Sequence, residues 1–193
     1  MSTLLVLPKL QVQKANAFSS AYSVGFPAMT AWHGFVHALE RLLNQSGFDI
    51  QLPQLGVVTY GVDVHRHKDR GDRIYSLKDQ GKPLKSDASR PSAVESATCD
   101  LTVTVIAKIQ GEYDEQLLIK TVQRLLLTKL RCCSGVIVNN HKPWLKEIAS
   151  DSDWFWLRRI LMPGQAIISR QDLLQTSMEQ TNDAIESMIQ CLG

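Results

Sequence analysis

The segment Val58 to Ala107 reads VTYGVDVHRHKDRGDRIYSLKDQGKPLKSDASRPSAVESATCDLTVTVIA, and the rest of the fold is organised around it. It leaves one strand-like run, passes through a polar insert that begins at His65, and returns through the strand-like run Leu101–Lys108. The second run is rich in β-branched residues, as strands are. Because it is apolar on both faces, we expect it to be a central strand of a sheet.

The insert concentrates the positive charge of the chain. Positions 65 to 90 hold eight Lys or Arg and four Asp, an excess of four positive charges, whereas the whole 193-residue chain carries +2. A basic protrusion of this kind attracts a polyanion such as a nucleic acid. A solvated surface loop is the alternative that charge alone leaves open. Gly71, Gly81 and Pro83 mark turns, and Ile74–Leu77 could form one arm of a small hairpin.

Two helix-like segments alternate with the strands around this insert. An apolar stripe predicts a helix from Thr30, its expected N-cap, to Gln45, with Gly47 just beyond its end. A second stripe predicts a helix from Tyr113 to Cys132. The strands are expected at Leu4–Val12, with Pro8 at a bulge or sheet edge, and at Leu55–Val64, Leu101–Lys108 and Val136–Val138. The order β-α-β-insert-β-α-β predicts an α+β, ferredoxin-like fold.

The C-terminal third is richer in tryptophan, with Trp144, Trp154 and Trp156. A turn near Pro163, a short strand at Ala166–Ile168 and a helix capped by Ser169 complete the pattern. Apolar residues recur in this helix at steps of four and three from Leu174 to Leu192, a narrow seam suited to its own sheet or to a partner helix. We therefore expect a palm at residues 1–140, an insert at about 64–97, and a C-terminal extension at residues 141–193.

The cysteines and histidines argue against a metal site. The four cysteines lack paired spacing, so we expect reduced thiols. His33 and His37 are four residues apart, but Gly34 stands where the helical zinc motif needs Glu, and no third ligand is evident. We therefore expect no metal and no other cofactor, and we interpret the two histidines as packing, hydrogen-bonding or ligand-facing residues.

Signals for secretion and for common enzyme classes are also missing from the sequence. No signal peptide and no membrane-length apolar run are present, so we expect a cytoplasmic protein without membrane contact. The phosphate-binding loop of NTPases and the Gly-x-Ser-x-Gly elbow of serine hydrolases are absent. The central strand has Thr and Val where RNA-recognition motifs place stacking aromatic residues. Any RNA should therefore be bound by the loops and the insert.

Several sequence blocks resemble one known family. LLVLPKL at 4–10, QKANA at 13–17, GFPA at 25–28 and GFVHALER at 34–41 resemble the second Csy subunit of type I-F CRISPR surveillance complexes, a Cas-five-type RAMP protein. RRILMPG at 158–164 and IISR at 167–170 resemble a later block of that family. The middle of the chain matches in layout rather than in residues. Family members continue well beyond the position of Arg170, so we expect a shorter C-terminal part here.

The resemblance implies a ferredoxin-like palm with a thumb-like insert. It implies binding to the 5′ handle of a CRISPR RNA, tight pairing with the large Csy subunit, and contact with the backbone Csy subunit. It implies no catalysis, because a different subunit processes the RNA. Target DNA would be reached through the assembled complex, in which guide–target base pairing reads the sequence.

The expected RNA contacts combine hydrogen-bonding groups in the loop that begins at Lys14 with basic residues of the insert that clamp phosphates. The expected RNA-binding residues are Lys14, Asn16, Ser19, Ser20, His33, His37, Arg66, Lys68, Arg70, Arg73 and Arg158. Two alternatives remain open. One is a RAMP-type CRISPR RNA endonuclease with His37 or His65 as general base. The other is a scaffold that only binds proteins, through the Trp154–Trp156 cluster and the C-terminal seam.

Overall fold

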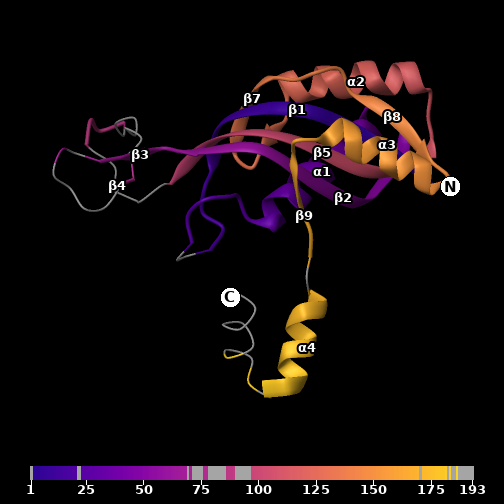
Figure 1. Cartoon of the computed structure of the whole chain (residues 1–193). Coiled ribbons are helices and arrows are strands. Elements are labelled where there is room, and N and C mark those ends of the chain that lie inside the picture. The colour runs from indigo at the N-terminus through magenta and orange to yellow at the C-terminus, as the bar shows by residue number, and fades with distance from the viewer. Residues whose placement is uncertain are drawn as a thin grey trace.

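A central antiparallel strand organises the fold, as the sequence predicted. β5 (Thr98–Glu112) lies between β1 (Ser2–Asn16) and β2 (Asp49–Val64) and is antiparallel to both. The sheet is completed by β7 (Gly135–Asn139) and β8 (Trp144–Ile148) on β1, β6 (Arg131–Cys132) on β7, and β9 (Gln165–Ile167) on β2 (Figure 1). The computed structural model describes residues 2–20, 23–68, 70, 76–77, 86–89, 97–169, 171–181, 183 and 186.

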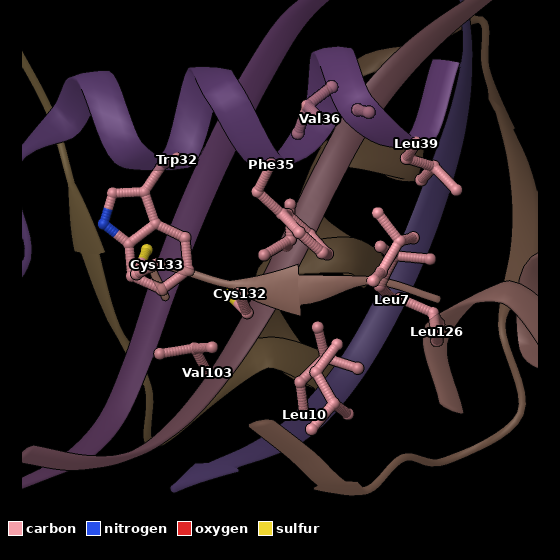
Figure 2. Close-up of a cluster of buried hydrophobic side chains, with 14 of the residues drawn as sticks. Leu7, Leu10, Trp32, Phe35, Val36, Leu39, Val103, Leu126, Cys132 and Cys133 are labelled. Atoms are coloured by element: carbon pink, nitrogen blue, oxygen red, sulfur yellow. The ribbon is translucent and has the colours of Figure 1, made fainter. Parts of the chain in front are cut away.

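Two helices pack on one face of this sheet and form the main core with it. α1 (Met29–Gln45) connects β1 to β2, and α2 (Glu115–Thr128) connects β5 to β6 and β7. Each fully buried aliphatic or aromatic side chain contributes roughly 1.5–3 kcal/mol to folding. Figure 2 shows the cluster where α1, α2 and the sheet meet, with Trp32, Phe35, Val36, Leu39, Leu126, Leu7, Leu10 and Val103. The predicted α+β class is confirmed.

The opposite face of the sheet is covered only in part. α3 (Asp151–Leu161) buries Leu157 against Leu4 and Val6 of β1 and against Ile148 of β8. Ser150 and Asp153 form a capping box that fixes the start of α3. Another part of this face lines an open pocket of about 440 Å³, whose residues include Gln11, Gln13, Asp63, Thr102 and Val138.

β1 keeps its apolar residues on the core side by means of two bulges. Its pairing with β5 shifts between Leu7 and Leu10, and again between Val12 and Ala15. Lys9 and Lys14, inside these shifts, have φ angles of 43° and 56°, which non-glycine residues rarely adopt. The bulge expected at Pro8 is therefore confirmed. The alternative of an edge position is wrong, because β1 pairs on both sides.

Two predicted helix boundaries are wrong. α1 has Ala28 rather than Thr30 as its N-cap, because the backbone N–H of Ala31 already donates to the carbonyl of Ala28 at 2.9 Å. α2 ends at Thr128 instead of continuing to Cys132, because Arg131 and Cys132 pair with β7 as a strand. The sequence could not reveal this change, since Leu130 and Cys132 continue the apolar helical pattern while being buried in the core.

The insert and the C-terminal region contain short elements. β3 (Arg66–His67) pairs with β4 (Ser76–Leu77), which confirms a small hairpin at the predicted place. α4 (Gln171–Thr181) stands apart from the sheet in Figure 1. Of the predicted seam, Met178 has a described side chain, which is 42% exposed, and most of the others lie outside the described residues. Within the described part of the chain, no helix is long and apolar enough to cross a lipid bilayer.

Candidate nucleic-acid interface

The last residues of β1 lie beside the root of the insert. Asn16 is opposite Thr98, and Val64, the last residue of β2, is opposite Cys99. The backbone N–H of Asn16 also donates to the carbonyl of Cys133, in the turn between β6 and β7, at 2.9 Å. One end of the sheet therefore brings together the last residues of β1 and the two ends of the basic insert. The loop predicted to begin at Lys14 begins after Asn16 instead, because Ala15 and Asn16 still pair with Cys99 and Thr98 of β5.

The carboxylate of Asp100 joins the insert root to β1. Its Oδ1 accepts the backbone N–H of Lys14 at 2.9 Å and lies 3.1 Å from Nε2 of His65. The other ring nitrogen of His65, Nδ1, lies 2.8 Å from the Thr98 hydroxyl, and the backbone N–H of His65 donates to the Thr98 carbonyl at 2.9 Å. Both ring nitrogens of His65 are thus engaged by β5, so this histidine anchors the insert root.

The loop after β1 presents hydrogen-bonding groups at its described residues. Asn16 Oδ1 accepts the backbone N–H of Phe18 at 3.1 Å, while Ser19 donates from its backbone and its hydroxyl to the carbonyl of Ser23. The side chains of Asn16, Ser19 and Ser20 are exposed. Exposed polar groups of this kind can meet the edges of unstacked bases.

Of the basic residues predicted in the insert, Arg66, Lys68 and Arg70 are exposed, and Arg66 is part of β3. Arg73 lies outside the described residues. Together with Lys14, the described residues place four positive charges around one end of the sheet, where they suit a phosphate backbone.

Three predicted contact residues lie elsewhere. His33 and His37 are exposed on α1 and line a pocket of about 180 Å³ beside Leu52 and Leu55 of β2. The insert leaves β2 nine residues beyond Leu55, which is roughly 30 Å along an extended strand. Arg158 is exposed on α3, which covers the face of the sheet opposite α1. The described residues contain no group of three or more His, Cys, Asp or Glu able to hold a metal ion.

Comparison with known proteins identifies the family. The family model described as "CRISPR-associated protein (Cas_Csy2)" matches residues 5–192. The chain belongs to the Csy2 family of CRISPR-associated proteins. The resemblance drawn from the sequence blocks is thereby confirmed.

A curated Csy2-family relative gives the extent of the similarity. The CRISPR-associated protein Csy2 of Pseudomonas aeruginosa (strain UCBPP-PA14) is 32% identical over 196 aligned positions, which cover 91% of this chain. The chain spans 58% of the length of that relative. The N-terminal blocks that carry the resemblance fall on β1, on the segment just before α1 and on α1. The later blocks cover the end of α3 and the last residue of β9.

Sequence reasoning missed the role of Asp100 in this Csy2-family chain. The signal was present, because Thr98, Asp100 and Thr102 alternate with buried Cys99 and Leu101 at the start of β5. Such alternation predicts a polar strand face. What the pattern could not reveal is the partner, since Lys14 is distant in sequence and meets Asp100 through a bulge.

Proposed function

We propose that this chain is a non-catalytic, RNA-binding subunit of a type I-F CRISPR RNA-guided surveillance complex that serves antiviral defence in the cytoplasm. Its Csy2-family membership over residues 5–192 carries this proposal. The placement of Lys14, Asn16 and the insert root at one end of the sheet supports it, because a polyanion could contact all of them together.

The architecture that we propose is a ferredoxin-like RAMP palm at residues 1–140. The strand order β7-β1-β5-β2, all antiparallel, supports this assignment, because α1 and α2 each connect two strands that flank a third. The thumb spans about 64–97, between β2 and β5. The extension at residues 141–193 adds β8 and β9 to the sheet edges and contains α4.

The RNA partner in this proposal is the 5′ handle of a CRISPR RNA. Lys14, Asn16, Ser19 and Ser20 would meet splayed bases, because folded proteins read single-stranded RNA mainly through unstacked nucleotides. The basic residues of the thumb would clamp the phosphates: Arg66, Lys68, Arg70 and Arg73. His33, His37 and Arg158 lie apart and would meet a different stretch of the ribonucleoprotein.

The protein partners in this proposal are the large Csy subunit and the backbone Csy subunit. On α3, Phe155 is 71% exposed and Trp154 is 49% exposed, beside exposed Arg158. Tryptophan and arginine dominate the energetics of protein interfaces, so this face suits a partner subunit. Contact with target DNA would follow from the assembly, through base pairing with the guide RNA.

The endonuclease alternative is disfavoured for one of its two candidate bases. His65 has both ring nitrogens occupied by Thr98 and Asp100, whereas His37 is exposed on α1. A general base needs a free nitrogen within reach of the proton that it removes.

Incubation of the full chain with a CRISPR repeat RNA tests this proposal, with a scrambled RNA as control. We expect a gel-shifted complex whose RNA remains intact. A discrete cleavage product that disappears in His65→Ala or His37→Ala would establish the endonuclease function instead.

A further inference from the structure

An apolar groove of about 730 Å³ lies between the start of α1, the edge of β2 and β9. Its lining includes Ser19 of the candidate RNA loop, Met29 at the start of α1, and Ile167 of β9. Met29 and Ile167 are 40% and 36% exposed, and Val62, which also lines the groove, is 39% exposed. The groove is therefore continuous with the candidate interface and accessible to a ligand.

One wall of the groove is a pre-positioned aromatic ring. Phe26 stacks on Trp32 with ring centroids 5.3 Å apart and an interplanar angle of 18°. Trp32 is fully buried, so its indole holds the phenyl ring of Phe26 in place. A fixed, flat apolar wall can pack against the face of a planar ligand without losing side-chain entropy on binding.

One buried polar atom at the groove lacks a partner. Thr59 lines the groove, and its Oγ1 is one of the few side-chain atoms of the described residues that are buried without a hydrogen-bond partner. Buried polar atoms normally have a partner, so an orphaned hydroxyl beside an open groove points to a bound molecule. The N-cap of α1, Ala28, supplies no side-chain hydrogen bond, so N–H groups of the first turn stay available at the positive end of the helix dipole.

We propose that this groove binds one unstacked nucleobase of the RNA, with a neighbouring phosphate at the start of α1. This inference rests on the RNA-binding function proposed above and assigns it a base subsite. The base packs against Phe26 and accepts a hydrogen bond from the hydroxyl group of Thr59. The phosphate accepts hydrogen bonds from the free backbone N–H groups of Met29 and Thr30. An apolar peptide side chain in the groove would leave these N–H groups without a partner.

The first variant separates stability from binding. Ala28→Asp supplies the missing N-cap, which should raise the Tm by about 2–4 °C. The added carboxylate also competes with the phosphate, so affinity for a single-stranded repeat RNA should fall about two- to fivefold. Gln116→Glu, which adds the same charge in the first turn of α2, is the control and should leave RNA affinity unchanged.

The second variant tests the base itself. Thr59→Val removes only the orphaned hydroxyl, so the Tm should hold or rise, while RNA affinity should fall about three- to tenfold. Thr102→Val, the same change on the opposite face of the sheet, should not alter RNA binding. A series of RNAs, each lacking one base, locates the bound nucleotide. Removal of the base at one position should lower the affinity of the wild-type protein about five- to 100-fold, and the same removal should lower the affinity of Thr59→Val by less.

The outcomes distinguish the two proposals. RNA that binds wild type, Ala28→Asp and Thr59→Val equally, with no missing-base position coupled to Thr59, would overturn the base subsite and leave RNA binding standing. Loss of affinity for the large subunit rather than for RNA in both variants would also overturn it and assign the groove to a peptide. Failure of wild type to bind any RNA would overturn the RNA-binding function and the subsite with it.

Discussion

At the scale of single residues, Asp100 explains how a basic insert is fixed to an apolar sheet. It accepts one hydrogen bond from the bulged backbone of Lys14 and faces the imidazole of His65. Composition and charge predict the insert and its basic residues. The anchor could not be predicted, because the left-handed backbone of Lys14 that brings it to Asp100 leaves no mark in the sequence.

The phosphate clamp is tested by Arg70→Ala. Arg70 is exposed, so its loss should not affect folding, but it should weaken RNA binding and lower the salt dependence of log Kd by about 0.7–1. Filter binding across a salt series measures both quantities. Lys120→Ala, on the exposed surface of α2, removes the same charge far from the insert and is the control. If both variants bind alike, Arg70 does not clamp a phosphate.

The pH dependence of stability is predicted at Asp153. The backbone N–H of Ala149, the hydroxyl of Ser150 and the ammonium of Lys146 lower the pKa of its carboxyl to about 2, from an ordinary value near 3.8. Because the folded-state pKa is depressed, the stabilisation is present above about pH 4 and is lost as the pH falls toward 2.

We therefore expect Asp153→Asn to melt below wild type at neutral pH, with a gap that closes as the pH falls from about 4 toward 2. Thermal melts across this pH range measure the gap. Asp151→Asn changes the same charge in the same turn of α3 without touching these bonds, and its melts should run parallel to those of wild type. A gap for Asp153→Asn that is constant with pH would contradict the assignment.

At the scale of elements, the long periodic segments were predictable and their junctions were not. The apolar stripe on α1 and the alternating pattern in β5 predict the type and the position of each element, because each element buries a complete face. The predicted end of α2 was wrong, because residues Arg131 and Cys132 pair with β7 as a strand although their sequence continues the helical pattern. The groove at the start of α1 could not be predicted from the sequence either, because tertiary packing brings Phe26, Thr59 and Ile167 together.

Two glycines give opposite predictions for the same substitution. A Cβ on Gly135 would lie 2.7 Å from the Gln13 carbonyl oxygen and 2.8 Å from the Ala15 nitrogen, so Gly135→Ala should destabilise the protein by about 1–3 kcal/mol. Gly34 is exposed in α1, and its added Cβ would meet nothing within 4 Å. Gly34→Ala should therefore stabilise by about 0.5–1 kcal/mol.

Denaturant unfolding measures both changes. Equal effects of the two substitutions, in either direction, would contradict the close approach of the β6–β7 turn to β1. That approach matters for the candidate interface, because the same turn accepts the backbone N–H of Asn16.

At the scale of the whole molecule, positive and negative side chains lie on different parts of the surface. Positive residues gather at the thumb, whereas the open part of the sheet face carries Asp63 and Asp100. Under the proposed function, this division would let a chain with a net charge of only +2 bind a polyanion, because local rather than net charge sets the field near the insert. The two-sided coverage of the sheet was not predictable, since the packing of α3 on β1 depends on the tertiary partner of Leu157.

The most direct test of the central claim is RNA binding by the full chain together with the large Csy subunit that we propose as its partner, comparing a 5′-handle RNA with a scrambled RNA across a salt series. We expect clear preference for the handle and an affinity that falls steeply as salt rises, because specific base contacts add to phosphate contacts. Equal, weak binding of the two RNAs would contradict handle recognition. It would leave a basic surface on a protein-binding scaffold.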